Sequence, residues 1–140
     1  MSRKVMETLQ QLSSRQHQKG DIVFRENEPS NNEMYFVLQG EVSIQKDRPG
    51  GPQEINHLTP GMFFGEMALV NDRPRLASAI CVTPTVRLVV IDRENLLKLS
   101  GTSPPFLFNL LKYSVSRLLA AEDKLQRAKE ELEAMGPGKR

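Results

Sequence analysis

The spacing of apolar and polar residues changes several times along the chain and predicts where helices give way to strands. In the first sixteen residues Val5, Leu9 and Leu12 recur at helical spacing, which predicts a short amphipathic helix over residues 1–16. From residue 21 onward, short runs rich in β-branched and aromatic residues are typical of strands. We expect strands at residues 21–25, 34–38, 42–44, 54–58, 78–82 and 86–91.

The segments between these strands are rich in Gly, Pro, Asn and Asp. Residues 26–32 have the composition of a turn, residues 47–52 that of a hairpin tip, and residues 59–61 that of a third turn. Many short strands with such punctuation predict an antiparallel β-roll or barrel. The fold class expected is therefore mainly β, with helices at both ends.

Helical spacing returns in the last third of the chain. Residues 92–99 predict a helix with Asp92 as its N-cap, and residues 101–105 break it. From Phe106 onward apolar and small residues step by four and three, up to the terminating residues 136–138. The positions of this seam are Leu107, Leu111, Ser114, Leu118, Ala121, Leu125, Ala128, Leu132 and Met135. Four heptads predict a two-stranded coiled coil, and hence a parallel homodimer through this helix.

Length and composition limit the classes of protein to consider. A chain of 140 residues with 39% hydrophobic and 26% charged residues is typical of one globular domain. We divide it into residues 1–103, the β-roll with its flanking helices, and residues 104–140, the C-terminal helix. A net charge of +2 is too small to indicate nucleic acid or membrane binding. The single cysteine, Cys81, excludes an internal disulfide, and with no secretory signal we expect a cytoplasmic protein.

The candidate chemistry lies in residues 64–79, FGEMALVNDRPRLASA. Gly65 allows a ligand to approach the backbone closely. Glu66 can accept hydrogen bonds from a sugar hydroxyl, and Arg75 carries a planar fork of donors that suits two oxygens of one phosphate. The bland alternative is that Glu66 and Arg75 form a surface ion pair of little energetic consequence.

This stretch closely resembles the phosphate-binding cassette of cyclic nucleotide-binding domains, the family of the cAMP receptor protein and the protein kinase A regulatory subunit. The resemblance implies a jelly-roll-like barrel over about residues 17–125, with Glu66 binding the ribose 2′-hydroxyl and Arg75 the cyclic phosphate. It also implies a set of residues around the ligand: Gly65, Met67, Ala68, Leu76, Ala77 and Ser78. Leu118 and Leu119 of the C-terminal helix are candidates for a lid over the base.

The identity of the nucleotide depends on fewer positions. Family members that favour cGMP usually carry a hydroxyl residue where this chain has Leu76, so the resemblance favours cAMP over cGMP as a regulatory ligand, not a cofactor. The residues Ala121 and Glu122 stand where the cAMP receptor protein group places a Thr-Ser pair against adenine.

Catalysis, metal binding and DNA binding are not expected. Ser78 has no nearby histidine, Glu66 has no partner carboxylate, and His17 and His57 lack metal-ligand spacing. No helix-turn-helix module follows the last helix. Two alternatives remain open: a non-binding dimeric β-barrel adaptor, and the ligand-binding fragment of a larger kinase, channel or transcription factor. The effector protein is not identified by the sequence.

Overall fold

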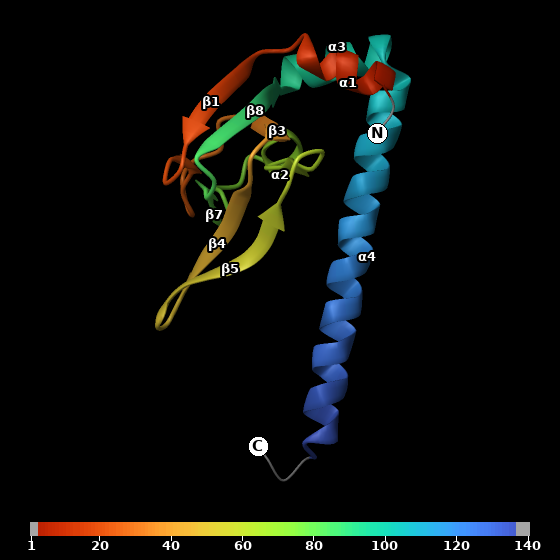
Figure 1. Ribbon diagram of the computed structural model, residues 1–140. Helices are drawn as coiled ribbons and strands as arrows, with labels where there is room; N and C mark the ends of the chain where they lie inside the picture. Colours follow the sequence, from red (N-terminus) through yellow and green to blue (C-terminus); the bar gives the residue numbers. More distant parts are fainter. Residues whose placement is uncertain (1–2, 137–140) are drawn as a thin grey trace.

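Two antiparallel sheets of four strands each face one another in the computed structural model, which describes residues 3–136 (Figure 1). The first sheet has the order β1 (Ser14–Gln18), β8 (Thr85–Asp92), β3 (Glu33–Gln39), β6 (Phe63–Phe64). The second has the order β2 (Ile22–Phe24), β7 (Ser78–Cys81), β4 (Val42–Arg48), β5 (Gly51–Leu58). Because neighbouring strands are mostly not consecutive in sequence, the chain passes repeatedly between the sheets. The expected jelly-roll-like fold is confirmed, as an open sandwich and not a closed barrel.

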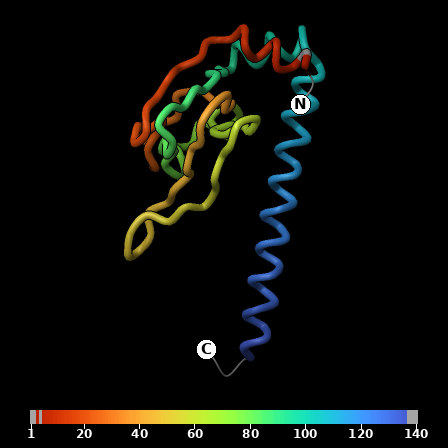
Figure 2. Tube along the Cα trace, viewed as in Figure 1, coloured from red at the N-terminus to blue at the C-terminus, as the bar shows by residue number. Residues whose placement is uncertain are grey.

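Within the described residues, four helices accompany the sheets: α1 (Arg3–Gln10), α2 (Met67–Val70), α3 (Arg93–Thr102) and α4 (Pro104–Ala134). In the chain trace of Figure 2, α1, α3 and the start of α4 lie together at one end of the sandwich. The α2 helix lies in the connection between β6 and β7. As expected, Asp92 caps α3, because its Oδ1 accepts a hydrogen bond from the Asn95 N–H at 2.8 Å.

The prediction of a helix over residues 1–16 was too long. Its first two residues lie outside those described, and α1 ends at Gln10. Ser14–Gln18 instead forms strand β1, paired antiparallel with β8 from Ser14 opposite Val89 to Gln18 opposite Thr85. The side chains of this segment are polar and carry no β signal, so the backbone pairing offered by β8 decides its conformation.

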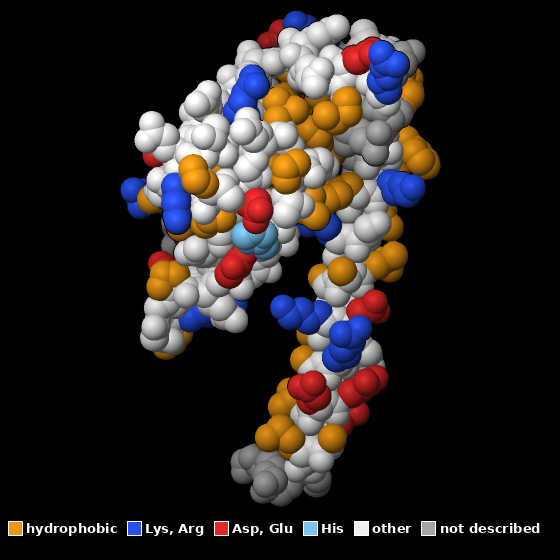
Figure 3. Space-filling model, in the orientation of Figure 1, with side chains coloured by type: hydrophobic (Ala, Val, Ile, Leu, Met, Phe, Trp, Pro, Cys, Tyr) orange, Lys and Arg blue, Asp and Glu red, His pale blue; other side chains and the backbone are white. Residues whose placement is uncertain are grey.

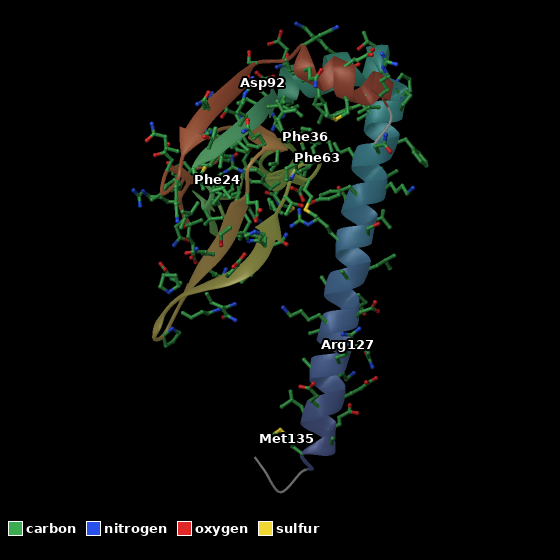
Figure 4. The ribbon with its side chains drawn as sticks, in the orientation of Figure 1. Phe24, Phe36, Phe63, Asp92, Arg127 and Met135 are labelled. Carbon is green, nitrogen blue, oxygen red and sulfur yellow. The ribbon has the colours of Figure 1, made fainter. Side chains whose placement is uncertain are left out.

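The two central strands of the first sheet, β3 and β8, are largely buried on both faces. On β8, Leu88 and Val90 point into the core between the two sheets, while Val89 and Ile91 point into a second core beneath α1, α3 and α4. Phe106, at the start of α4, is fully buried in that second core. Figure 4 shows Phe36 and Phe63 on the side of the sheet that faces the helices, and their ring centroids are 4.9 Å apart.

Only the first part of α4 packs against the sandwich. Tyr113 is half-buried there, whereas every residue from 118 to 135 is exposed. Figure 4 shows Arg127 and Met135 on the part of the helix that continues past the sheets. No helix among residues 3–136 combines the length and the apolar character that a membrane span requires.

Candidate functional site

The predicted site lies in the connection that carries the chain from β6 in the first sheet to β7 in the second. It opens with Gly65, whose φ of +77° is a left-handed conformation. A Cβ atom at this position would lie 3.0 Å from Nη1 of Arg75 and 3.4 Å from ring atoms of Phe24 and Tyr35. Position 65 therefore requires glycine for two reasons: the left-handed backbone conformation and the close approach of the Arg75 side chain.

Arg75 is buried, and its guanidinium is held by three oxygen atoms of the protein. Nη1 donates to the Gly65 carbonyl at 3.1 Å, and Nη2 donates to Asn31 Oδ1 at 2.6 Å and to the Glu33 carbonyl at 2.9 Å. The guanidinium carbon lies 4.1 Å from the Phe24 ring centroid. These contacts fix the plane of the fork and leave two of the five N–H donors of a guanidinium for another acceptor.

In the part of the chain that the structure describes, no carboxylate neutralises this buried cation at close range. Within residues 3–136, no Asp or Glu oxygen lies within 4.0 Å of the Arg75 guanidinium. Burial lowers the pKa of Arg75 below its ordinary value, and the more distant Tyr35, Glu28 and Glu33 partly offset that shift. A buried, oriented cation without a counter-ion is a favourable site for an anion.

Glu66 does not pair with Arg75. Its Oε1 lies 2.7 Å from Nη1 of Arg117 on α4, a contact between residues 51 positions apart. Next to it, the Tyr113 hydroxyl donates to the Phe63 carbonyl at 3.0 Å, and the Arg117 guanidinium lies 5.7 Å from the Tyr113 ring centroid. The surface ion pair between Glu66 and Arg75, the bland alternative, is not formed, and the connection is bonded to α4 instead.

A pocket of about 230 Å³ opens between this connection, strands β4 and β5, and α4. Most of the sequence-predicted site residues line it, namely Gly65, Glu66, Met67, Ala68, Arg75, Leu76 and Ala77. Ser78 does not line it, and its hydroxyl accepts a hydrogen bond from the Glu26 N–H at 2.9 Å. Leu118 and Leu119 do not line it either, with 68% and 60% of their surface exposed, so their role as a lid stays a prediction.

A second group of residues lines the pocket, to which the sequence analysis assigned no role; four of them lie inside residues 64–79, and the other four, Phe24, Ile44, Ile55 and Arg117, were missed altogether. Apolar side chains from other strands and three polar ones complete the wall: Phe24, Ile44, Ile55, Phe64, Asn71, Arg73 and Arg117, together with Pro74. Arg117 gave no signal in the sequence, because one arginine on a long polar helix is unremarkable until its partner is known. Among residues 3–136, no three His, Cys, Asp or Glu side chains are grouped so that they could hold a metal ion.

A β-sandwich with a buried cation, a carboxylate and an apolar wall around one pocket is a small-ligand-binding module. The comparison with known families agrees and is specific. The chain belongs to the cyclic nucleotide-binding domain family, whose model matches residues 14–103.

Named relatives show where such domains occur. The chain is 33% identical over 90 residues to the cAMP-dependent protein kinase type II regulatory subunit of Drosophila melanogaster, covering 64% of this chain and 24% of the relative. It is 34% identical over 102 residues to human cGMP-dependent protein kinase 2, covering 71% and 13%. The solved structure of the Thermus thermophilus catabolite activator protein superposes with a TM-score of 0.79 at 27% identity, covering 92% and 61%. The chain thus spans about a quarter or less of the two kinase-related proteins.

Proposed function

We propose that this chain is a regulatory sensor that binds cAMP in the pocket beside Arg75 and passes the signal to α4. The observation that carries the proposal is the buried Arg75 guanidinium at the wall of a pocket, which is oriented by three protein oxygens and has no carboxylate partner among the described residues. Its unused N–H donors suit the cyclic phosphate. Glu66 suits the ribose 2′-hydroxyl, because its Oε2 has no hydrogen-bond partner within residues 3–136.

The apolar part of the pocket suits the base. Ile44, Ile55 and Leu76 offer aliphatic surface from three different segments. Leu76 has no hydroxyl for the amino group of guanine, which favours cAMP over cGMP. The named relatives include both a cAMP-dependent and a cGMP-dependent protein, so they support the class of ligand, and Leu76 supports the choice within it.

The contacts of α4 offer a route by which binding alters the helix. A ribose hydroxyl on Glu66 shares the carboxylate that Arg117 contacts, and Tyr113 ties the same helix to the β6 backbone. In this proposal residues 104–140 receive the signal and the domain carries out no catalysis. The effector is a separate protein or segment in the cytoplasm.

A parallel homodimer through α4 is part of the proposal. Leu111, Leu118, Leu125 and Leu132 are spaced by seven and all expose more than half of their surface. Figure 3 shows hydrophobic side chains exposed along this helix. Exposed leucines at heptad spacing are the pattern that a second helix covers.

Titration calorimetry and thermal unfolding with cAMP and cGMP test the binding proposal. A ligand at about 100 times its dissociation constant stabilises a protein by about 2.7 kcal/mol, so we expect a clear rise in Tm with cAMP. Arg75→Lys keeps the charge and loses the planar fork, and we expect at least a tenfold weaker affinity. Arg48→Lys, at the exposed hairpin tip, is the matched control and should bind as the wild type does. No stabilisation by either nucleotide would refute the sensor and leave the dimeric adaptor.

A further inference from the structure

The wall of the pocket includes an irregular point in strand β5. Along the β4–β5 ladder Ile44 pairs with Asn56 and Gln45 pairs with Glu54, so Ile55 is an extra residue without a partner. This is a β-bulge, a feature that redirects a side chain and often occurs beside functional sites. Ile55 lines the pocket. The position of its side chain therefore depends on how firmly the bulge is held.

A histidine with two carboxylate partners holds the bulge. Nδ1 of His57 lies 2.6 Å from Oε1 of Glu54, on the other side of Ile55, and Nε2 lies 2.5 Å from Oε1 of Glu41. Carboxylates only accept hydrogen bonds, so both ring nitrogens must carry a proton for both hydrogen bonds to form.

Glu41 anchors this cluster to the rest of the sheet. Its N–H donates to Oγ1 of Thr83 at 2.9 Å, and its carbonyl accepts from the Val82 N–H at 3.1 Å, so it is fixed to the connection between β7 and β8. The charged groups that face the ring are Glu41 and Glu54, while the residue opposite His57 on β4 is the uncharged Ser43. The ring thus bridges the bulge to a segment that does not belong to β5.

We propose that His57 is a proton-dependent clamp that keeps Ile55 in place at the pocket, so that nucleotide affinity falls when the ring loses its proton. The inference rests on the proposed function, because it concerns the same pocket. In a neutral ring one nitrogen becomes an acceptor that faces a carboxylate, and one of the two hydrogen bonds breaks. His57 is a positioning residue here and does not touch the nucleotide itself.

The direction of the pH dependence follows from the hydrogen bonds of the ring. The bonds to Glu41 and then Glu54 raise the pKa of His57 above its ordinary value of 6.5. The clamp is therefore complete below pH 6.5 and is released as the pH rises through the folded-state pKa. We expect affinity to fall by about two- to fivefold across that rise, because interactions between half-exposed charged groups are weak.

The test is the pH profile of cAMP affinity, measured by calorimetry on the full chain together with an NMR titration of the His57 ring. In the wild type affinity should fall with the NMR-detected loss of the proton. His57→Gln should bind cAMP with the same affinity at low and at high pH. The control His17→Gln, which removes the other histidine, should keep the pH profile of the wild type. Ile55→Ala should bind more weakly and lose the profile while the ring still titrates above 6.5.

Two results would overturn the clamp: an affinity independent of pH in the wild type, or an unchanged profile in His57→Gln. Failure of cAMP and cGMP to bind at any pH refutes the proposed function instead. In that case the protection of the Ile55 and Asn56 amides from hydrogen exchange tests the clamp without any ligand. Protection must fall with rising pH in the wild type and not in His57→Gln, and equal protection in the two proteins would overturn the inference.

Discussion

Replacing Glu66 with glutamine separates a structural ion pair from a ligand-binding carboxylate. Glu66→Gln preserves the shape of the side chain and removes its charge. In the free protein the substitution removes the ion pair with Arg117, which is 2.7 Å long and joins side chains that are 27% and 38% exposed. Solvent screens a pair of this kind, so we expect the free energy of unfolding to fall by only about 0.5 kcal/mol.

The expected effect on affinity is larger. A hydrogen bond to a charged acceptor contributes about 1.5–3 kcal/mol and a neutral one about 0.5–1.5 kcal/mol. The difference of about 1–1.5 kcal/mol corresponds to a five- to tenfold weaker affinity for cAMP. Glu66→Ala, which removes both acceptor oxygens, should weaken binding at least tenfold.

Calorimetric titration with cAMP and thermal unfolding of the free protein measure the two effects. Glu94→Gln is the matched control, because Glu94 forms an exposed ion pair with Lys98 at 3.5 Å on α3, away from the pocket. It should change neither affinity nor Tm measurably. Unchanged affinity in both Glu66 variants would show that Glu66 only anchors α4, and the assignment of the ribose site would be wrong.

Three further predictions concern other parts of the molecule. Gly65→Ala should lower the free energy of unfolding, measured in urea, by about 1–3 kcal/mol, because it adds backbone strain and a clash with Arg75. The control Gly61→Ala, at a φ of +95° with open space around it, should lower the free energy of unfolding by less. Burial raises the pKa of the Cys81 thiol to about 11, so at pH 8 iodoacetamide should modify it only after unfolding, and rapid labelling of the native protein would contradict its burial. Leu125→Glu should convert the proposed dimer to a monomer in light scattering, and a wild-type protein that is monomeric at micromolar concentration would refute the α4 dimer.

The sequence was most informative where chemistry and chain order coincide. The residues of the connection from Gly65 to Ala77 are contiguous, and the resemblance of this stretch to a known phosphate-binding cassette pointed to most of its residues that line the pocket. Strand β8 was predictable for a different reason: it lies between two cores and therefore must be apolar on both faces. The ends of strands were less predictable: the β4–β5 hairpin continues to Arg48 and Gly51, through polar residues that pair only because they are close to the turn.

Interactions between distant segments were not predictable from local pattern. Arg117 meets Glu66 across 51 residues, and Asn31 reaches Arg75 across 44. Neither residue belongs to a motif, and each acquires its role only from the packing of α4 and of the turn before β3. The sequence also gives no signal for the extra residue at Ile55, because a bulge depends on the register of two strands and not on the composition of one.

The length of α4 has a mechanical consequence. From Arg117 to its last residue, Ala134, the helix extends about 25 Å beyond its anchoring contacts, at a rise of about 1.5 Å per residue. A tilt of about 5° at those contacts would displace the far tip by roughly 2 Å over that distance. If α4 carries the signal as proposed, its length would convert a rearrangement of fractions of an ångström around Glu66 into a displacement of a few ångströms at its far end.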